Sequence, residues 1–252
     1  MKEQYEIESI LEQTSKAIVY KAHNKNSGKQ CLIKRYLVDG TVEFSSTPDW
    51  KKQFQSMIRD FSQTEHPSLR SVIDGGFDSV DQNPYVVFEW FNSSRLDNLM
   101  KISPNNELQL VQSLAKFTLT AVSFLHQNGL SLGIMAPNKV HYTICEEKTE
   151  WVLDWCPLTT LKLKCQEGGI QVSDYLAPEE RSLGSQPSSK SYLYAIGKVI
   201  EEFAGFYIIE NNFQDWVSKL TATSPLRRYN DSHDALVGLS DFQFTSQEVF
   251  AA

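Results

Sequence analysis

The sequence is poor in cysteine and shows no arrangement of cysteines that is typical of a metal site. The four cysteines lie singly, without a CxxC pair and without a histidine at ligand spacing. This pattern predicts reduced, mostly buried thiols in a cytosolic compartment rather than a disulfide framework or a zinc site. The four residues are Cys31, Cys145, Cys156 and Cys165.

Long apolar stretches are also missing. No apolar run approaches the roughly 18 residues that a membrane helix needs. The polar residues 1–6 do not resemble the apolar core of a signal peptide. We therefore expect a cytoplasmic chain without direct membrane insertion.

Basic residues are outnumbered by acidic ones. The chain has 24 Lys and Arg against 31 Asp and Glu, a net charge of −7 and a pI near 5.3. This balance argues against nucleic acid or an anionic membrane as the main partner. With 41% hydrophobic residues over 252 positions, the chain is long enough for one large domain or two lobes that share a core.

Short β-rich runs dominate the first 90 residues or so. A helix over residues 50–63 is predicted between the third and fourth strands, because its apolar residues repeat at helical spacing on one face. The apolar face comprises Phe54, Met57, Ile58 and Phe61. The expected strands lie at residues 5–7, 17–22, 31–36, 69–77 and 85–90.

Helical patterning follows from about residue 95. The longest helix is expected over residues 108–126, where apolar residues form one buried stripe. The other expected helices lie at residues 96–100, 191–203, 212–220 and 231–239, and short strands are expected at 140–144 and 151–153. The order predicts an α+β chain, β-rich first and helical afterwards.

Several segments in this order resemble motifs of eukaryotic-type (Hanks-type) Ser/Thr protein kinases. Cys31-Leu-Ile-Lys34 is similar to the Val-Ala-Ile-Lys strand, and Leu153-Asp154-Trp155-Cys156 stands at the Asp-Phe-Gly position. Tyr175-Leu-Ala-Pro-Glu179 resembles the end of the activation segment. The resemblance covers nearly the whole chain, and the wording of the small lobe is similar to bacterial members.

The resemblance implies a bilobal protein-kinase-like fold of the α+β class. A small antiparallel β lobe with one main helix would precede a larger, mainly helical lobe. The whole chain, 1–252, would be a single domain. Its N-lobe would cover 1–91 with a hinge near 89–94, its C-lobe 95–240, and residues 241–252 would form a tail.

The glycine-rich loop of such kinases is altered. Glu12, Thr14 and Ala17 stand where three glycines would let backbone N–H groups approach the phosphates. Side chains hinder that approach, and the negative charge of Glu12 repels a phosphate. The resemblance therefore predicts a poor phosphate cradle.

Four further positions of the active site are degenerate. Met57 replaces the helix glutamate that pairs with the lysine, and Tyr192 replaces the aspartate that braces the catalytic loop. Ile134 replaces the catalytic aspartate and cannot accept a proton. Lys139 replaces the metal-binding asparagine and would repel Mg²⁺. We expect no catalytic residue and no metal site.

Lys34 and Asp154 alone remain of the nucleotide machinery that the resemblance implies. They are the candidate cofactor-binding residues, although we expect no bound cofactor; for Lys34 the alternative is an ordinary strand lysine that faces solvent. Phe88 falls at the gatekeeper position, where its ring would narrow an adenine pocket.

The replacements suggest a packed site. Trp155 is expected to fill a hydrophobic column with Leu132 and Phe61, and Ile134 is expected to be largely buried. Arg228 is expected to form a structural ion pair with Glu179 in the large lobe.

These features resemble those of a pseudokinase, which is not an enzyme but a scaffold or allosteric regulator of another protein. Two alternatives stay open. The chain could be a sensor module that binds ATP without hydrolysing it, or a repurposed nucleotide-dependent transferase that uses Lys34 and Asp154.

Overall fold

The chain folds into two compact units in a computed structural model. The first unit contains residues 1–93 together with Asp154 and Trp155, and the second contains the other described residues. The structure describes residues 1, 3–15, 17–37, 49–63, 66–102, 108–129, 135–145, 148–155, 174–181, 188–205 and 211–240.

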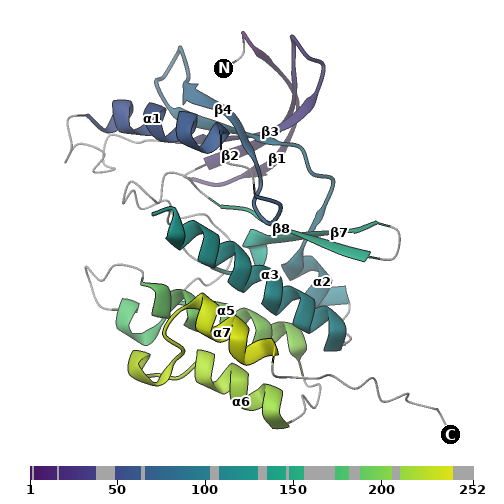
Figure 1. Ribbon diagram of the computed structural model, residues 1–252. Coiled ribbons are helices and arrows are strands. Elements are labelled where there is room, and N and C mark those ends of the chain that lie inside the picture. The colour runs from purple at the N-terminus through teal and green to yellow at the C-terminus, as the bar shows by residue number, and fades with distance from the viewer. Residues whose placement is uncertain are drawn as a thin grey trace, which may run out of the picture. The chain divides into compact units, whose positions relative to one another are not determined.

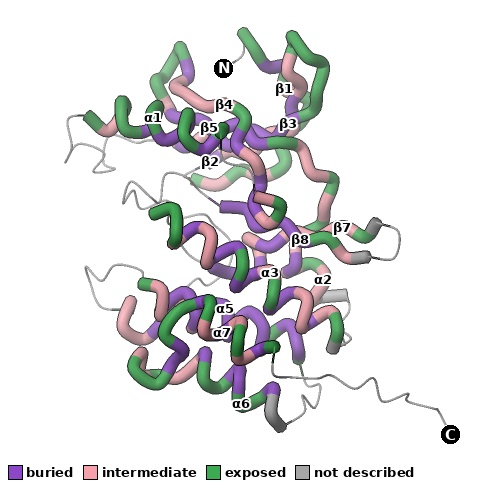
Figure 2. Tube along the Cα trace, in the orientation of Figure 1, coloured by how far each residue is buried: buried purple, intermediate pink, exposed green. Residues whose placement is uncertain are grey.

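The first unit is built on a five-stranded antiparallel sheet with the order β1-β2-β3-β5-β4 (Figure 1). All five predicted strands are present, and β1 extends further than expected because its pairing with β2 continues to Gln13 and Ile18. The strands are β1 (Tyr5–Gln13), β2 (Ala17–Asn24), β3 (Gln30–Tyr36), β4 (Val72–Phe77) and β5 (Pro84–Glu89). Of the three inner strands, β3 and β5 are buried along most of their length (Figure 2).

Helix α1 (Trp50–Ser62) packs against this sheet through the predicted apolar face. Phe54, Met57, Ile58 and Phe61 are all buried, as the helical spacing predicted. A Cβ at Gly75 in β4 would lie 2.9 Å from a backbone oxygen and 3.1 Å from Ile58. The glycine therefore lets α1 lie close to the sheet.

The second unit is mainly helical. Helix α3 (Leu108–Gln127) packs against α5 (Ser189–Ala204) and α7 (Ser232–Ser240), while α6 (Asn211–Leu220) packs against α5 and α7 (Figure 1). The predicted stripe of α3 is buried and comprises Val111, Leu114, Thr118, Ala121, Val122 and Leu125. The remaining elements are α2 (Leu96–Ile102), η2 (Pro137–Lys139), η4 (Pro178–Arg181) and η5 (Pro225–Arg227).

A small sheet with the order β6-β7-β8 belongs to the same unit. Strands β7 (Val140–Cys145) and β8 (Lys148–Leu153) were predicted, whereas β6 (Ser94–Arg95) is too short to show a pattern in the sequence. Within the described ranges, none of the helices combines the length and apolarity that crossing a bilayer takes.

Candidate functional site

Lys34 and Asp154 form a buried ion pair within the first unit. Lys34 lies on β3, and its Nζ is 2.5 Å from Oδ2 of Asp154. The two residues are only 4% and 7% exposed, and the ammonium also lies 5.7 Å from the centroid of the buried Phe88 ring. The alternative of a solvent-facing lysine at this position is therefore wrong.

Arg70 is a third charged residue of the same site, and the sequence reasoning missed it. Its side chain is 2% exposed, and its Nε lies 3.8 Å from Oδ1 of Asp154. Its Nη1 donates a hydrogen bond of 3.3 Å to the carbonyl oxygen of Glu89 at the end of β5. An arginine among Leu69, Val72 and Ile73 was the available signal, because an arginine inside a buried segment is normally paired.

Lys34, Arg70 and Asp154 are called the charged triad below. It contains two cations and one carboxylate, all of them buried. Burial lowers the pKa of Arg70, while the neighbouring Asp154 raises it in opposition. A buried ion pair of this kind is stable only when its geometry and its other hydrogen bonds are good.

Trp155 contacts the triad through Arg70. Its Nε1 donates a 3.0 Å hydrogen bond to the carbonyl oxygen of Arg70, and its ring meets that of Phe61 at 4.5 Å between centroids in an edge-on contact. The predicted contact between Phe61 and Trp155 is thus present. Leu132, the third expected member of that column, lies outside the described residues.

The turn between β1 and β2 is closed by its own hydrogen bonds. The backbone N–H of Thr14 donates to the carbonyl of Ala17 at 2.9 Å. In return, the N–H of Ala17 donates to the hydroxyl oxygen of Thr14 at 3.0 Å. Two of the three positions where the kinase resemblance expects glycine therefore bind each other, and the Ala17 amide is already occupied.

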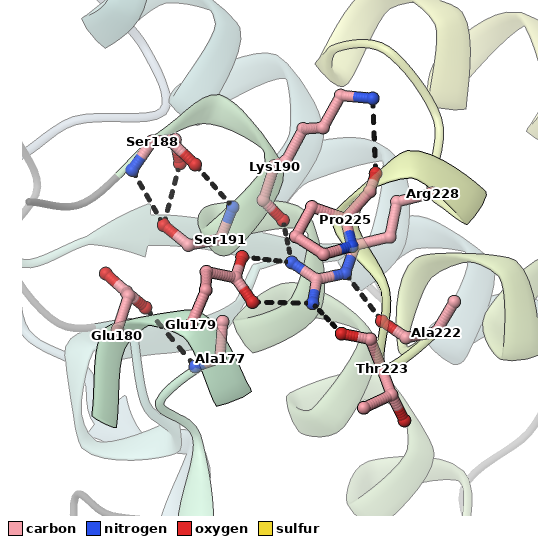
Figure 3. Close-up of polar contacts among 10 residues, drawn as sticks. All are labelled: Ala177, Glu179, Glu180, Ser188, Lys190, Ser191, Ala222, Thr223, Pro225 and Arg228. Carbon is pink, nitrogen blue, oxygen red and sulfur yellow. Dashed lines mark hydrogen bonds and ion pairs between the residues drawn. The ribbon is translucent and has the colours of Figure 1, made fainter. Parts of the chain in front are cut away.

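The second unit contains a separate polar network around Arg228 (Figure 3). Arg228 donates to both carboxylate oxygens of Glu179, at 2.6 and 2.9 Å. It also donates to three backbone carbonyls, those of Lys190, Ala222 and Thr223, at 2.9, 2.7 and 3.2 Å. The predicted ion pair between Glu179 and Arg228 is confirmed.

The same network shifts the acidity of Glu179. Burial alone would raise the pKa of its carboxyl group, but hydrogen bonds from Arg228 and from the backbone, together with the charge of Arg228, bring the pKa below its usual value of 4.5. Glu179 therefore contributes stability above about pH 4.5, and this contribution is lost as the pH falls through the lower folded pKa.

No protein-family model matches the chain. A curated relative, the probable serine/threonine-protein kinase fhkA of Dictyostelium discoideum, is 30% identical over 128 residues. The matched segment is 49% of this chain and 21% of that protein. The chain thus matches about a fifth of the length of this relative.

Solved structures resemble most of the chain. The kinase domain of PknI from Mycobacterium tuberculosis aligns with 94% of this chain and 96% of its own length, with a TM-score of 0.70 and 15% identity. A double mutant of that domain aligns with a TM-score of 0.72, again at 15% identity, over 94% and 95% of the two chains. This chain has a protein-kinase fold. At such identity the likeness concerns the fold, and it confirms the predicted α+β kinase-like architecture.

A divalent cation, which the kinase fold implies, does not fit the donors of the charged triad. Asp154 is the one carboxylate among the three, and a cation faces each of its oxygens. A divalent ion at about 4 Å from one such cation is repelled by about 8 kcal/mol at an effective dielectric constant of about 20. Among the described residues, moreover, no three acidic, histidine or cysteine side chains are grouped for metal binding.

The degenerate kinase positions fall in both units. Met57 is buried on α1, where its thioether offers no negative charge to a lysine. Tyr192 on α5 is buried, with its ring 4.9 Å from that of His126, and burial lowers the pKa of this histidine. Lys139 is partly exposed at the end of η2. Ile134 lies outside the described residues, so its burial stays a prediction.

Proposed function

We propose that this chain is a pseudokinase, a kinase fold that transfers no phosphate and acts as a scaffold or allosteric regulator of another protein. The charged triad carries this proposal. Asp154 would have to hold a metal in an active kinase, but Lys34 and Arg70 compensate its charge within the same unit. A Mg²⁺ ion on this carboxylate would lie close to both cations, whose positive charges oppose its binding.

The residues that would perform the chemistry support the same conclusion. Ile134 offers no base for the substrate hydroxyl, and the loss of a general base typically lowers a rate by about 10²–10⁴. Lys139 brings a positive charge where a neutral metal ligand is needed. The closed turn at Thr14 and Ala17 leaves one backbone amide fewer for a phosphate.

A fixed surface suits a protein that works by binding. The first unit is held by the triad and by Trp155, and the second by the Arg228 network. The partner that we propose is another protein. The net charge of −7 supports this choice over nucleic acid. The cytoplasmic location stays a prediction from the sequence.

Phosphotransfer by the purified chain is the test of this proposal. Incubation with radiolabelled ATP, Mg²⁺ or Mn²⁺ and a generic protein substrate should label neither the substrate nor the chain above the level of the Lys34→Ala variant. An active kinase domain in the same assay controls for its sensitivity. Labelling by the wild type that disappears in Lys34→Ala would show that the chain is an enzyme.

A second candidate is a sensor module that binds ATP without hydrolysing it. The observation in its favour is that Lys34 and Asp154 lie together in one unit, as a nucleotide site would require. A repurposed transferase would use the same two residues, but it would also consume ATP. Absence of ATP consumption with retained ATP binding would therefore single out the sensor.

A further inference from the structure

We propose that Arg70 is the permanent counter-ion of Asp154, in the role that a divalent cation has in metal-dependent kinases. The negative charge of Asp154 would then be balanced without a metal ion. This inference rests on the proposed function in taking the charged triad as the functional site, and it adds the residue that excludes the metal.

The first reason is that each oxygen of the Asp154 carboxylate faces a different cation. Oδ2 of Asp154 lies 2.5 Å from Nζ of Lys34, and Oδ1 lies 3.8 Å from Nε of Arg70. A metal ion bound to either oxygen would lie close to one of these cations. The approach of a divalent ion is therefore opposed from both sides of the carboxylate.

The fixed position of Arg70 is the second reason. Its guanidinium donates to the carbonyl of Glu89, and its own carbonyl accepts from the indole of Trp155. With 2% of its side chain exposed, it is not a surface arginine that can move into solvent at little cost. The contact with Asp154 is a charge interaction at 3.8 Å and not a hydrogen bond, so the hydrogen bond to Glu89 is what fixes the guanidinium beside the carboxylate.

The net charge of the triad is the third reason. Two cations and one carboxylate give a buried excess of one positive charge, which disfavours a further cation. Neutralising Arg70 should leave a charge-balanced pair of Lys34 and Asp154, with one carboxylate oxygen no longer faced by a guanidinium. A weak site for a divalent ion should then appear.

Manganese alone is the probe that tests this inference, because its binding can be followed by electron paramagnetic resonance without any nucleotide. The wild-type chain should bind no Mn²⁺ that depends on Asp154. Arg70→Met should gain Mn²⁺ affinity by about tenfold or more, and the double variant Arg70→Met/Asp154→Asn should lose the gain. Arg59→Met, which removes an exposed arginine from the same unit, should leave Mn²⁺ binding unchanged.

Circular dichroism checks that each variant is folded. If Arg70→Met does not fold, Arg70→Gln takes its place, because its amide keeps polar N–H groups at the site while the positive charge is removed. Asp154-dependent Mn²⁺ binding by the wild type would overturn the inference, and so would a folded, neutral Arg70 variant without any gain. Either result leaves the phosphotransfer test untouched, so the inference and the proposed function can fail separately.

Discussion

Replacing Asp154 by asparagine should lower the free energy of unfolding by about 3–5 kcal/mol, because Lys34 and Arg70 then lose the carboxylate that they share. Lys34→Met should cost less, since the remaining pair of Arg70 and Asp154 is still balanced. Urea unfolding followed by tryptophan fluorescence gives both values, provided that the m-value does not change.

Asp81→Asn is the matched control for this substitution. Asp81 pairs with Arg35 in the same unit, but its side chain is 37% exposed, and pairs of this kind contribute about 0–1 kcal/mol. A neutral or stabilising effect of Asp154→Asn would contradict the structural role of the triad. Such an effect is expected of a catalytic carboxylate, because active sites often sacrifice stability for activity.

Arg228→Met should destabilise the second unit by about 3–5 kcal/mol. The substitution removes the partner of Glu179 and the donor to three partly buried backbone carbonyls, and carbonyls that lose their donors away from water are costly. Glu179 is 31% exposed, so water can compensate part of its loss, and the carbonyls should account for much of the effect. Chemical denaturation at pH 7 measures the difference.

The neighbouring Arg227 provides the control, because it is exposed and Arg227→Met should change the stability by less than about 0.5 kcal/mol. The loss of stability caused by Arg228→Met should also become smaller as the pH is lowered. Because the folded pKa of Glu179 is lowered, its share of the stability is present above about pH 4.5 and vanishes as the pH falls through that folded pKa. Equal effects of the two substitutions, or a deficit that grows with acid, would refute this view of the network.

Periodic patterns in the sequence were sufficient to predict most of the helices and strands, whereas the kinase-like fold was predicted from the order of the motifs. The apolar face of α1 and the stripe of α3 follow helical spacing, and both are buried. The sequence pattern predicts that α5 starts at Ser191, two residues later than in the structure, because the pattern does not show the capping role of Ser188. Its side chain accepts from the N–H of Ser191 and allows the helix to begin at Ser189.

The site could be predicted only in part. Lys34 and Asp154 stand out because each belongs to a recognisable motif, and the structure places them in contact. Arg70 belongs to no such motif, and its role depends on contacts with residues 19 and 84 positions away, Glu89 and Asp154. Sequence reasoning from one chain cannot place such partners, because only the folded chain brings them together.

The altered glycine-rich loop shows the same limit. The replacement of glycine by Thr14 and Ala17 predicted steric hindrance of a phosphate. It did not predict that the two residues would bind each other across the turn. That outcome depends on the register of β1 and β2, in which Gln13 lies opposite Ile18.

Thermal unfolding of the wild-type chain with ATP, with and without Mg²⁺, tests the central claim most directly. A ligand at about 100 times its Kd stabilises a protein by about 2.7 kcal/mol, so binding is easily detected. Because Lys34 and Arg70 already balance the charge of Asp154, we expect Mg²⁺ to have no effect on the midpoint of thermal unfolding at any ATP concentration. A rise in the midpoint that requires both ATP and Mg²⁺, and that disappears in Asp154→Asn, would contradict the claim that Asp154 is engaged within the fold.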